Sequence, residues 1–134
     1  MRGAYTCGVL DAFLDHDIEV DGLIGVSAGI CHGCSYVSKQ RGRAFRVMSD
    51  YLRDPRYMSM RSLIQTGDLF NAEFVYHTLP EILDRYDFQT FNRSHTRLYA
   101  VCSNLESGEA EYIRLIHMED TTFFDTLRKK MFKE

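Results

Sequence analysis

The pentapeptide Gly25-Val26-Ser27-Ala28-Gly29 is the stretch that decides the fold of this 134-residue chain. It has the form G-x-S-x-G and stands between a short apolar segment, Val20 to Val26, and a proline-free segment, Ala28 to Val37. A strand, a sharp turn and a helix in this order present a serine at the top of a sheet, where it acts as a nucleophile. We therefore predict a short buried strand, a nucleophile at Ser27 and a helix behind it.

Small residues around the serine have a physical reason in such a turn. A larger side chain at Gly25 or Gly29 is expected to collide with neighbouring backbone, and glycine also tolerates strained torsion angles. Gly29 and Gly33 share one face of the predicted helix, so they let it approach the sheet closely. The open alternative is a glycine-rich turn with an unreactive serine, because such pentapeptides also occur in ordinary turns.

The beginning of the chain carries a second pattern at a specific distance from the first. Met1 to Thr6 is followed by a predicted helix over Gly8 to Leu14 and then by Asp21 to Gly29. This order and spacing resemble the start of a bacterial patatin-like phospholipase domain. The resemblance implies an α/β fold, a three-layer α/β/α sandwich with a nucleophile elbow. It also implies that Ser27 attacks an ester of a lipid or phospholipid.

In that family a motif G-G-G-x-R-G precedes the first helix and donates backbone N–H groups to the oxyanion. Met1-Arg2-Gly3 matches only its last three positions, so Arg2 and Gly3 are expected to be the remnant of the oxyanion loop. Loss of one such donor typically lowers the rate by about 10²–10³-fold. The family's first strand would also precede Met1.

The other end of the chain leads to the same expectation. The family's dyad aspartate stands in a later D-G-G or D-G-A motif, and no Asp-Gly pair follows Leu23. We therefore expect residues 1–134 to be a partial patatin-like domain, cut at both ends, without a catalytic aspartate and without turnover. Either the coding start is placed too late, at an internal methionine, or the chain is a true fragment.

Histidine is the alternative base for a Ser-His-Asp triad. His117 comes closest by its order in the chain, whereas His32 lies about 500° around the helix from Ser27 and points away. His16, between two aspartates at a helix end, needs no catalytic role. We expect surface or core positions for all five histidines: His16, His32, His77, His95 and His117.

Composition bounds the function classes. The chain is 45 % apolar with a formal charge of −3, which is typical of one soluble domain and gives no indication of nucleic-acid binding. No run of 18 apolar residues and no signal sequence is present, so we expect a cytoplasmic location. The patatin-like resemblance implies no metal and no organic cofactor.

The four cysteines do not look like a disulfide framework. Cys31 and Cys34 form a C-x-x-C, but a zinc site needs a second ligand pair, and a redox pair stands at a helix N-terminus rather than inside the helix. We expect both to pack as small apolar residues against the sheet.

The remaining chain predicts further elements of an α/β fold. Gly42 to Arg53 is expected to be a helix, with Phe45 facing in and Arg43 facing out, where its arginines either solvate the face or attract lipid head groups. Asn71 is expected to cap a helix over Ala72 to Leu79, which Pro80 interrupts or restarts. Arg97 to Ser103 and Ala110 to Ile116 are expected to form a hairpin, with the first strand buried on both faces.

The sequence thus predicts a serine acyl hydrolase of lipids, with peripheral contact to a membrane surface. Two alternatives stay open: a non-catalytic remnant that binds lipid or a partner, and an acyltransferase with a similar serine elbow. Because a central strand would be missing beside the Ser27 strand, self-association through an exposed sheet edge is also expected.

Overall fold

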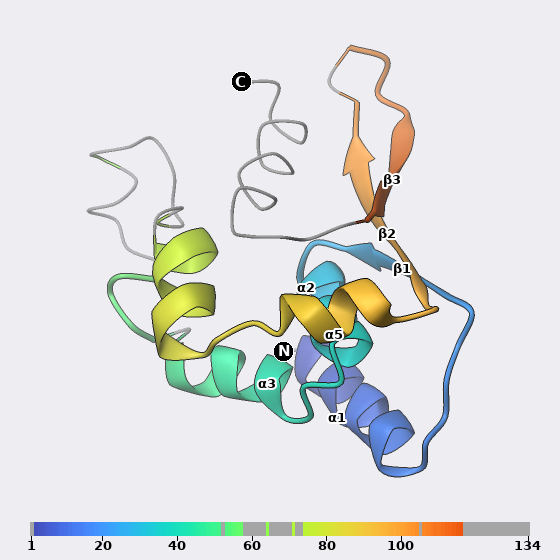
Figure 1. Ribbon diagram of the computed structural model, residues 1–134. Coiled ribbons are helices and arrows are strands. Elements are labelled where there is room, and N and C mark those ends of the chain that lie inside the picture. Colours follow the sequence, from blue (N-terminus) through green and yellow to red (C-terminus); the bar gives the residue numbers. More distant parts are fainter. Residues whose placement is uncertain are drawn as a thin grey trace.

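The computed structural model describes residues 2–51, 53–57, 64, 71, 74–104 and 106–116, and the fold below is given for these residues (Figure 1). Helices and strands follow one another along the chain, so the α/β class is confirmed. In chain order the elements are α1 (Arg2–Asp15), β1 (Gly22–Val26), α2 (Ala28–Val37), α3 (Arg43–Arg46), η1 (Val47–Tyr51), η2 (Phe74–Leu83), α5 (Phe88–Arg93), β2 (Arg97–Ser103) and β3 (Ala110–Leu115). The elements η1 and η2 are π-helices.

The described sheet is mixed, with the order β1-β2-β3. β1 pairs parallel to β2, placing Gly25 opposite Ala100, and β2 pairs antiparallel to β3. The predicted hairpin is therefore confirmed, and its second strand ends one residue earlier than expected. In Figure 1 the helices gather on one side of β1, and the hairpin extends away from them.

The core lies between α2 and the sheet face that Leu98, Ala100 and Leu115 form. Gly33 makes this contact close, because a Cβ there would lie 2.9 Å from Leu98 Cδ1 and the Leu98 side chain would have to shift. The prediction that small residues let the helix approach the sheet is thus confirmed at Gly33. It is wrong at Gly29, where a Cβ would meet no atom within 4 Å.

The opposite face of the sheet corrects the prediction of a buried strand before the elbow. Ile24 and Val26 are 66 % and 63 % exposed, and Tyr112 on β3 is exposed as well. The reason is topological: α2 covers only the face that carries Leu23 and Gly25, because side chains alternate along a strand. Along its other edge β1 pairs with no strand among the described residues.

The segment after α2 differs from its prediction in the way it faces the core. Arg43, expected to face solvent, is 7 % exposed, and Phe45, expected in the core, is exposed. Arg43 Nη2 donates to the Asp84 carbonyl at 2.9 Å, and its guanidinium lies over the Tyr86 ring, 5.1 Å from the centroid. The inward and outward positions were predicted for an α-helix with 3.6 residues per turn. Here α3 is a single turn that continues as a π-helix, which has more residues per turn, so the predicted positions do not hold.

The second π-helix agrees in part with its prediction. Asn71 Oδ1 accepts from the N–H of Phe74 at 3.1 Å, so the predicted cap is confirmed. The helix runs through Pro80 to Leu83. Most of the segment from Met58 to Phe70 lies outside the described residues.

Candidate active site

Ser27 occupies the single residue between β1 and α2, in a backbone conformation that side chains rarely adopt. Its torsion angles are φ 51° and ψ −122°, and its side chain is exposed. Such a conformation is strained by about 1–3 kcal/mol and persists only where the surroundings enforce it. The turn therefore has the geometry of a strand-to-helix elbow with the serine outward.

Gly25 is what permits the turn to close. A Cβ at this position would lie 2.6 Å from the Ile30 nitrogen and 2.8 Å from the Gly29 carbonyl carbon. Both are backbone atoms, which cannot retreat without moving α2. The collision predicted from sequence is thus confirmed at Gly25 and wrong at Gly29, although the two glycines are symmetric in the motif.

The N-terminus of α2 begins directly behind the serine. The N–H of Ile30 donates to the Ser27 carbonyl at 3.0 Å, whereas the N–H groups of Ala28 and Gly29 precede the first intrahelical bond. Free N–H groups at a helix start, together with the helix dipole, favour a negative charge. The elbow can therefore supply donors to an oxyanion formed at Ser27, the N–H of Ala28 first among them.

Arg2 and Gly3 were expected in a loop, and here the structure corrects the prediction. Both belong to the first turn of α1. A Cβ at Gly3 would lie 2.9 Å from His32 Nε2, so the start of α1 is closely packed against α2. The N–H groups of Arg2 and Gly3 are in the first helical turn, where no intrahelical acceptor is available, and their role at the oxyanion stays a prediction.

No described histidine reaches the serine by hydrogen bond. His32 is buried, and its Nδ1 lies 3.5 Å from Cys7 Sγ. Burial lowers the pKa of His32, so its ring is neutral near pH 7. His16 and His95 are exposed, as expected, and His117 and the side chain of His77 lie outside the described residues.

Among the residues that the structure describes, Ser27 Oγ has no hydrogen-bond partner at all. The base that would activate Ser27 is therefore not identified there.

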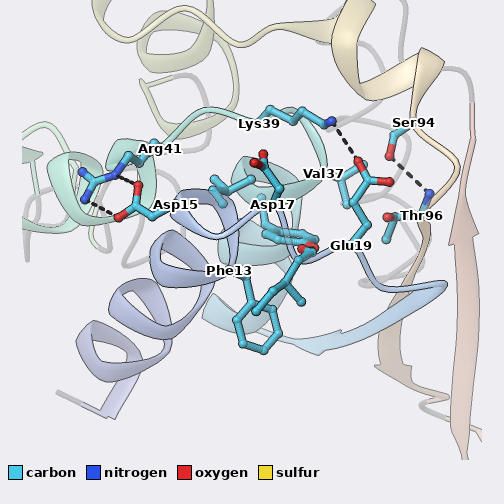
Figure 2. A pocket seen from close by; sticks show the side chains of 12 residues that line it. Phe13, Asp15, Asp17, Glu19, Val37, Lys39, Arg41, Ser94 and Thr96 are labelled. Carbon is cyan, nitrogen blue, oxygen red and sulfur yellow. Dashed lines mark hydrogen bonds and ion pairs between the residues drawn. The ribbon is translucent and has the colours of Figure 1, made fainter.

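One cavity among the described residues lies away from the elbow. It measures about 220 Å³ and is lined by the ends of α1 and α2 and by the chain leading into β2 (Figure 2). Two ion pairs flank it, Arg41 with Asp15 and Lys39 with Glu19. The Arg41 hydrogen bond lowers the pKa of Asp15. Ser27 follows the opposite, carboxyl end of β1 and does not line this cavity.

The C-x-x-C of α2 is split by the fold. Cys34 is buried, as expected, and burial raises the pKa of its thiol to about 12. Cys31 is exposed, so the expected apolar packing is wrong for it.

Within the described part of the chain, no three His, Cys, Asp or Glu side chains are grouped so that they could hold a metal ion. Nor is any helix of that part both long and apolar enough to span a membrane.

Sequence reasoning missed two groups of buried side chains in this part of the fold. One is the ion pair of Arg43 with Asp84, at 3.4 Å, and the other joins Cys7, His32 and Met48. No local sequence pattern predicts either group, because Arg43 and Asp84 are 41 residues apart in the chain and Cys7 and His32 are 25 residues apart.

Comparison with known proteins identifies the family. The family described as Patatin, patatin-like phospholipase, matches residues 1–130. No curated protein and no solved structure matches the chain. The family match extends through the elbow and both strands of the hairpin.

Proposed function

This chain belongs to the patatin-like phospholipase family, and from that premise we propose that Ser27 is the nucleophile of a lipid acyl hydrolase. The observation that carries the proposal is the strained turn: a serine at φ 51° is held exposed between a strand and a helix start. The family is one of lipid hydrolases. The assignment of the reaction to Ser27 in this chain is our inference.

The chemistry follows from the elbow. Ser27 Oγ attacks the ester carbonyl carbon of the lipid and transfers its proton to a base, and the carbonyl oxygen becomes an oxyanion. We expect the Ala28 N–H at the start of α2 to donate to that oxygen. Collapse of the intermediate breaks the ester C–O bond, and the base returns the proton to the leaving oxygen, so that the alcohol departs. The acyl-serine that remains is hydrolysed by water, which yields the fatty acid and free Ser27. The family's base is an aspartate, which we do not assign to any residue of this chain.

A fluorophosphonate probe tests the nucleophile without requiring the right lipid. The probe phosphonylates an activated serine, and mass spectrometry locates the adduct. We expect an adduct on Ser27 that is absent from Ser27→Ala, while exposed Ser107 serves as an internal reference for unspecific labelling. A sample that circular dichroism shows to be folded and that gains no adduct on Ser27 would contradict the proposal for this chain.

Acyl transfer to an acceptor other than water is separated by a second measurement. A thioester donor that acylates Ser27 but releases little free fatty acid would favour an acyltransferase. Release of the acid from an ester substrate favours hydrolysis. Because no base contacts Ser27 Oγ among the residues that the structure describes, we still expect no turnover by this chain, even where the probe reacts.

A non-catalytic binding function is favoured by a separate observation. Ile24 and Val26, directly before the elbow, are largely exposed, and exposed apolar groups favour contact with lipid or protein. Binding to phosphatidylcholine vesicles that persists in Ser27→Ala and is lost in Val26→Ser would support it. No binding in a flotation assay counts against it.

Self-association is the second form of this binding. β1 has an edge that pairs with no described strand, and such an edge can add a strand from a second chain. Gel filtration at several concentrations measures it. A sharp monomer peak throughout would exclude pairing through β1.

A further inference from the structure

Three sulfur and nitrogen atoms from three different elements meet beside the start of α1. Cys7 Sγ on α1 lies 3.5 Å from His32 Nδ1 on α2 and 3.7 Å from Met48 Sδ on η1. His32 Nε2 is also close to the thiol, at 3.8 Å. The serine mechanism uses none of these atoms.

The fold encloses this group between α1, α2 and η1. Cys7 is 2 % exposed and His32 is 3 % exposed, while Met48 is partly buried. The backbone of Gly3 lies beside the cluster, and a Cβ there would lie 2.9 Å from His32 Nε2 and 3.8 Å from Met48 Cε. Because glycine stands there, the imidazole and the thioether can share the side of the cluster that a methyl group would fill.

A cysteine beside a histidine suggests a nucleophilic pair first, but burial argues against that role. Burial, and then the charge of Asp11, raise the pKa of the Cys7 thiol. Burial lowers the pKa of His32. The pair is therefore a neutral thiol and a neutral imidazole, whereas nucleophilic cysteines need a thiolate and access to solvent.

The spacing of the donor atoms suits a common metal ion instead. With metal–sulfur bonds of about 2.3 Å and metal–nitrogen bonds of about 2.0 Å, donors at 110–120° to one another stand roughly 3.5–4.0 Å apart. The Sγ to Nδ1 and Sγ to Sδ distances, 3.5 and 3.7 Å, lie in this range. Two of the three donor separations therefore have the length that ligands of one metal ion show.

We propose that Cys7, His32 and Met48 form a binding site for monovalent copper. A thiolate and a thioether are soft ligands that select Cu(I), and imidazole suits copper as well. Zinc is disfavoured, because structural zinc sites use four cysteine or histidine ligands. Binding breaks the S–H bond of Cys7, forms a copper–sulfur bond and releases one proton to solvent, with no change in the oxidation state of copper.

The test is a competition titration with Cu(I) and the chromophoric chelator bicinchoninate, without oxygen and with ascorbate as reductant. We expect the protein to take one equivalent of Cu(I) from the chelator. Met48→Leu, which keeps the packing volume, is expected to weaken binding about 10-fold or more, and Cys7→Ser about 100-fold or more. Because a proton is released, binding should also weaken as the pH is lowered.

Cys31→Ser is the matched control, because Cys31 is an exposed thiol of the same helix as His32 and belongs to the C-x-x-C. This variant should keep the affinity of the unmodified protein. Loss of copper in Cys31→Ser with retention in Met48→Leu would overturn the proposal, as would a folded protein that takes no copper. Circular dichroism verifies folding, and Met48→Leu decides if Cys7→Ser does not fold.

Discussion

Replacing the two glycines of the elbow one at a time by alanine should give opposite results. In Gly25→Ala the new Cβ would lie 2.6 Å from the Ile30 nitrogen, 2.7 Å from the Ile30 Cα and 2.8 Å from the Gly29 carbonyl carbon. In Gly29→Ala it would meet nothing within 4 Å. The two variants add the same methyl group to the same five-residue motif, so each is the control for the other.

The magnitudes follow from these contacts. Forcing an extra carbon into a packed site costs about 1–3 kcal/mol, occasionally more. We expect about 3 kcal/mol for Gly25→Ala, because all three crowded atoms are backbone and the helix start must shift. Gly29 lies in the first turn of α2, where alanine is favoured over glycine by up to about 1 kcal/mol. The two variants should thus differ by about 3–4 kcal/mol in the free energy of unfolding.

Urea unfolding followed by far-ultraviolet circular dichroism measures both values. Fluorophosphonate labelling of the same samples reports the elbow itself: Gly29→Ala should label Ser27 as the unmodified protein does, and Gly25→Ala should not. Equal unfolding midpoints for the two variants would refute the reasoning, because they would mean that the turn at Gly25 relaxes freely or that Gly29 is crowded.

Three further predictions concern single residues. Ser27→Gly should exceed Ser27→Ala by about 1–2 kcal/mol in the free energy of unfolding, because glycine alone is unstrained at this turn, and equal urea midpoints would argue against strain. Tyr86→Phe removes the hydroxyl that donates to the Cys34 carbonyl at 2.9 Å and should cost only about 1 kcal/mol in urea unfolding, because that carbonyl still accepts from Ser38; a loss of several kcal/mol would show that Tyr86 does more. Burial lowers the pKa of His32 from 6.5, so on acidification the unfolded chain takes up a proton on this residue before the folded chain does. The stability that the neutral, buried His32 ring contributes is therefore complete above about pH 6.5 and is lost as the pH falls below that value. Urea midpoints across pH should show this loss in the unmodified protein and less of it in His32→Gln, and an identical pH dependence in both would assign it to other groups.

The features that could be predicted from sequence are those governed by neighbours in the chain. Helix α2 was predicted with the bounds Ala28–Val37 that the structure has, because no proline interrupts the apolar pattern behind the elbow. The β2–β3 hairpin was predicted to within one residue, and Asn71 caps the helix it was expected to cap. In each case the deciding interaction joins residues that are close in sequence. The resemblance to the patatin-like family likewise rests on the local order and spacing of residues.

The candidate site was predictable in position but not in its surroundings. Ser27 stands at a strained turn where the motif places it, while its role as the nucleophile stays a prediction. Arg2 and Gly3 were predicted in a loop but are helical. The first turn of α1, to which they belong, packs on α2 at His32. The packing partner, His32, is far away in sequence, so no reading of the first residues shows it.

The sequence by itself determined the family, the α/β order of elements and the residue that the elbow presents. The tertiary structure decided which of two equivalent glycines is crowded, that Arg43 is buried beside Asp84, and that Cys7 meets His32 and Met48. The physical reason is range. Torsion preferences and hydrogen bonds between near neighbours are set by local sequence, whereas steric overlap, burial and the meeting of donor atoms depend on where α1, α2 and η1 lie in space.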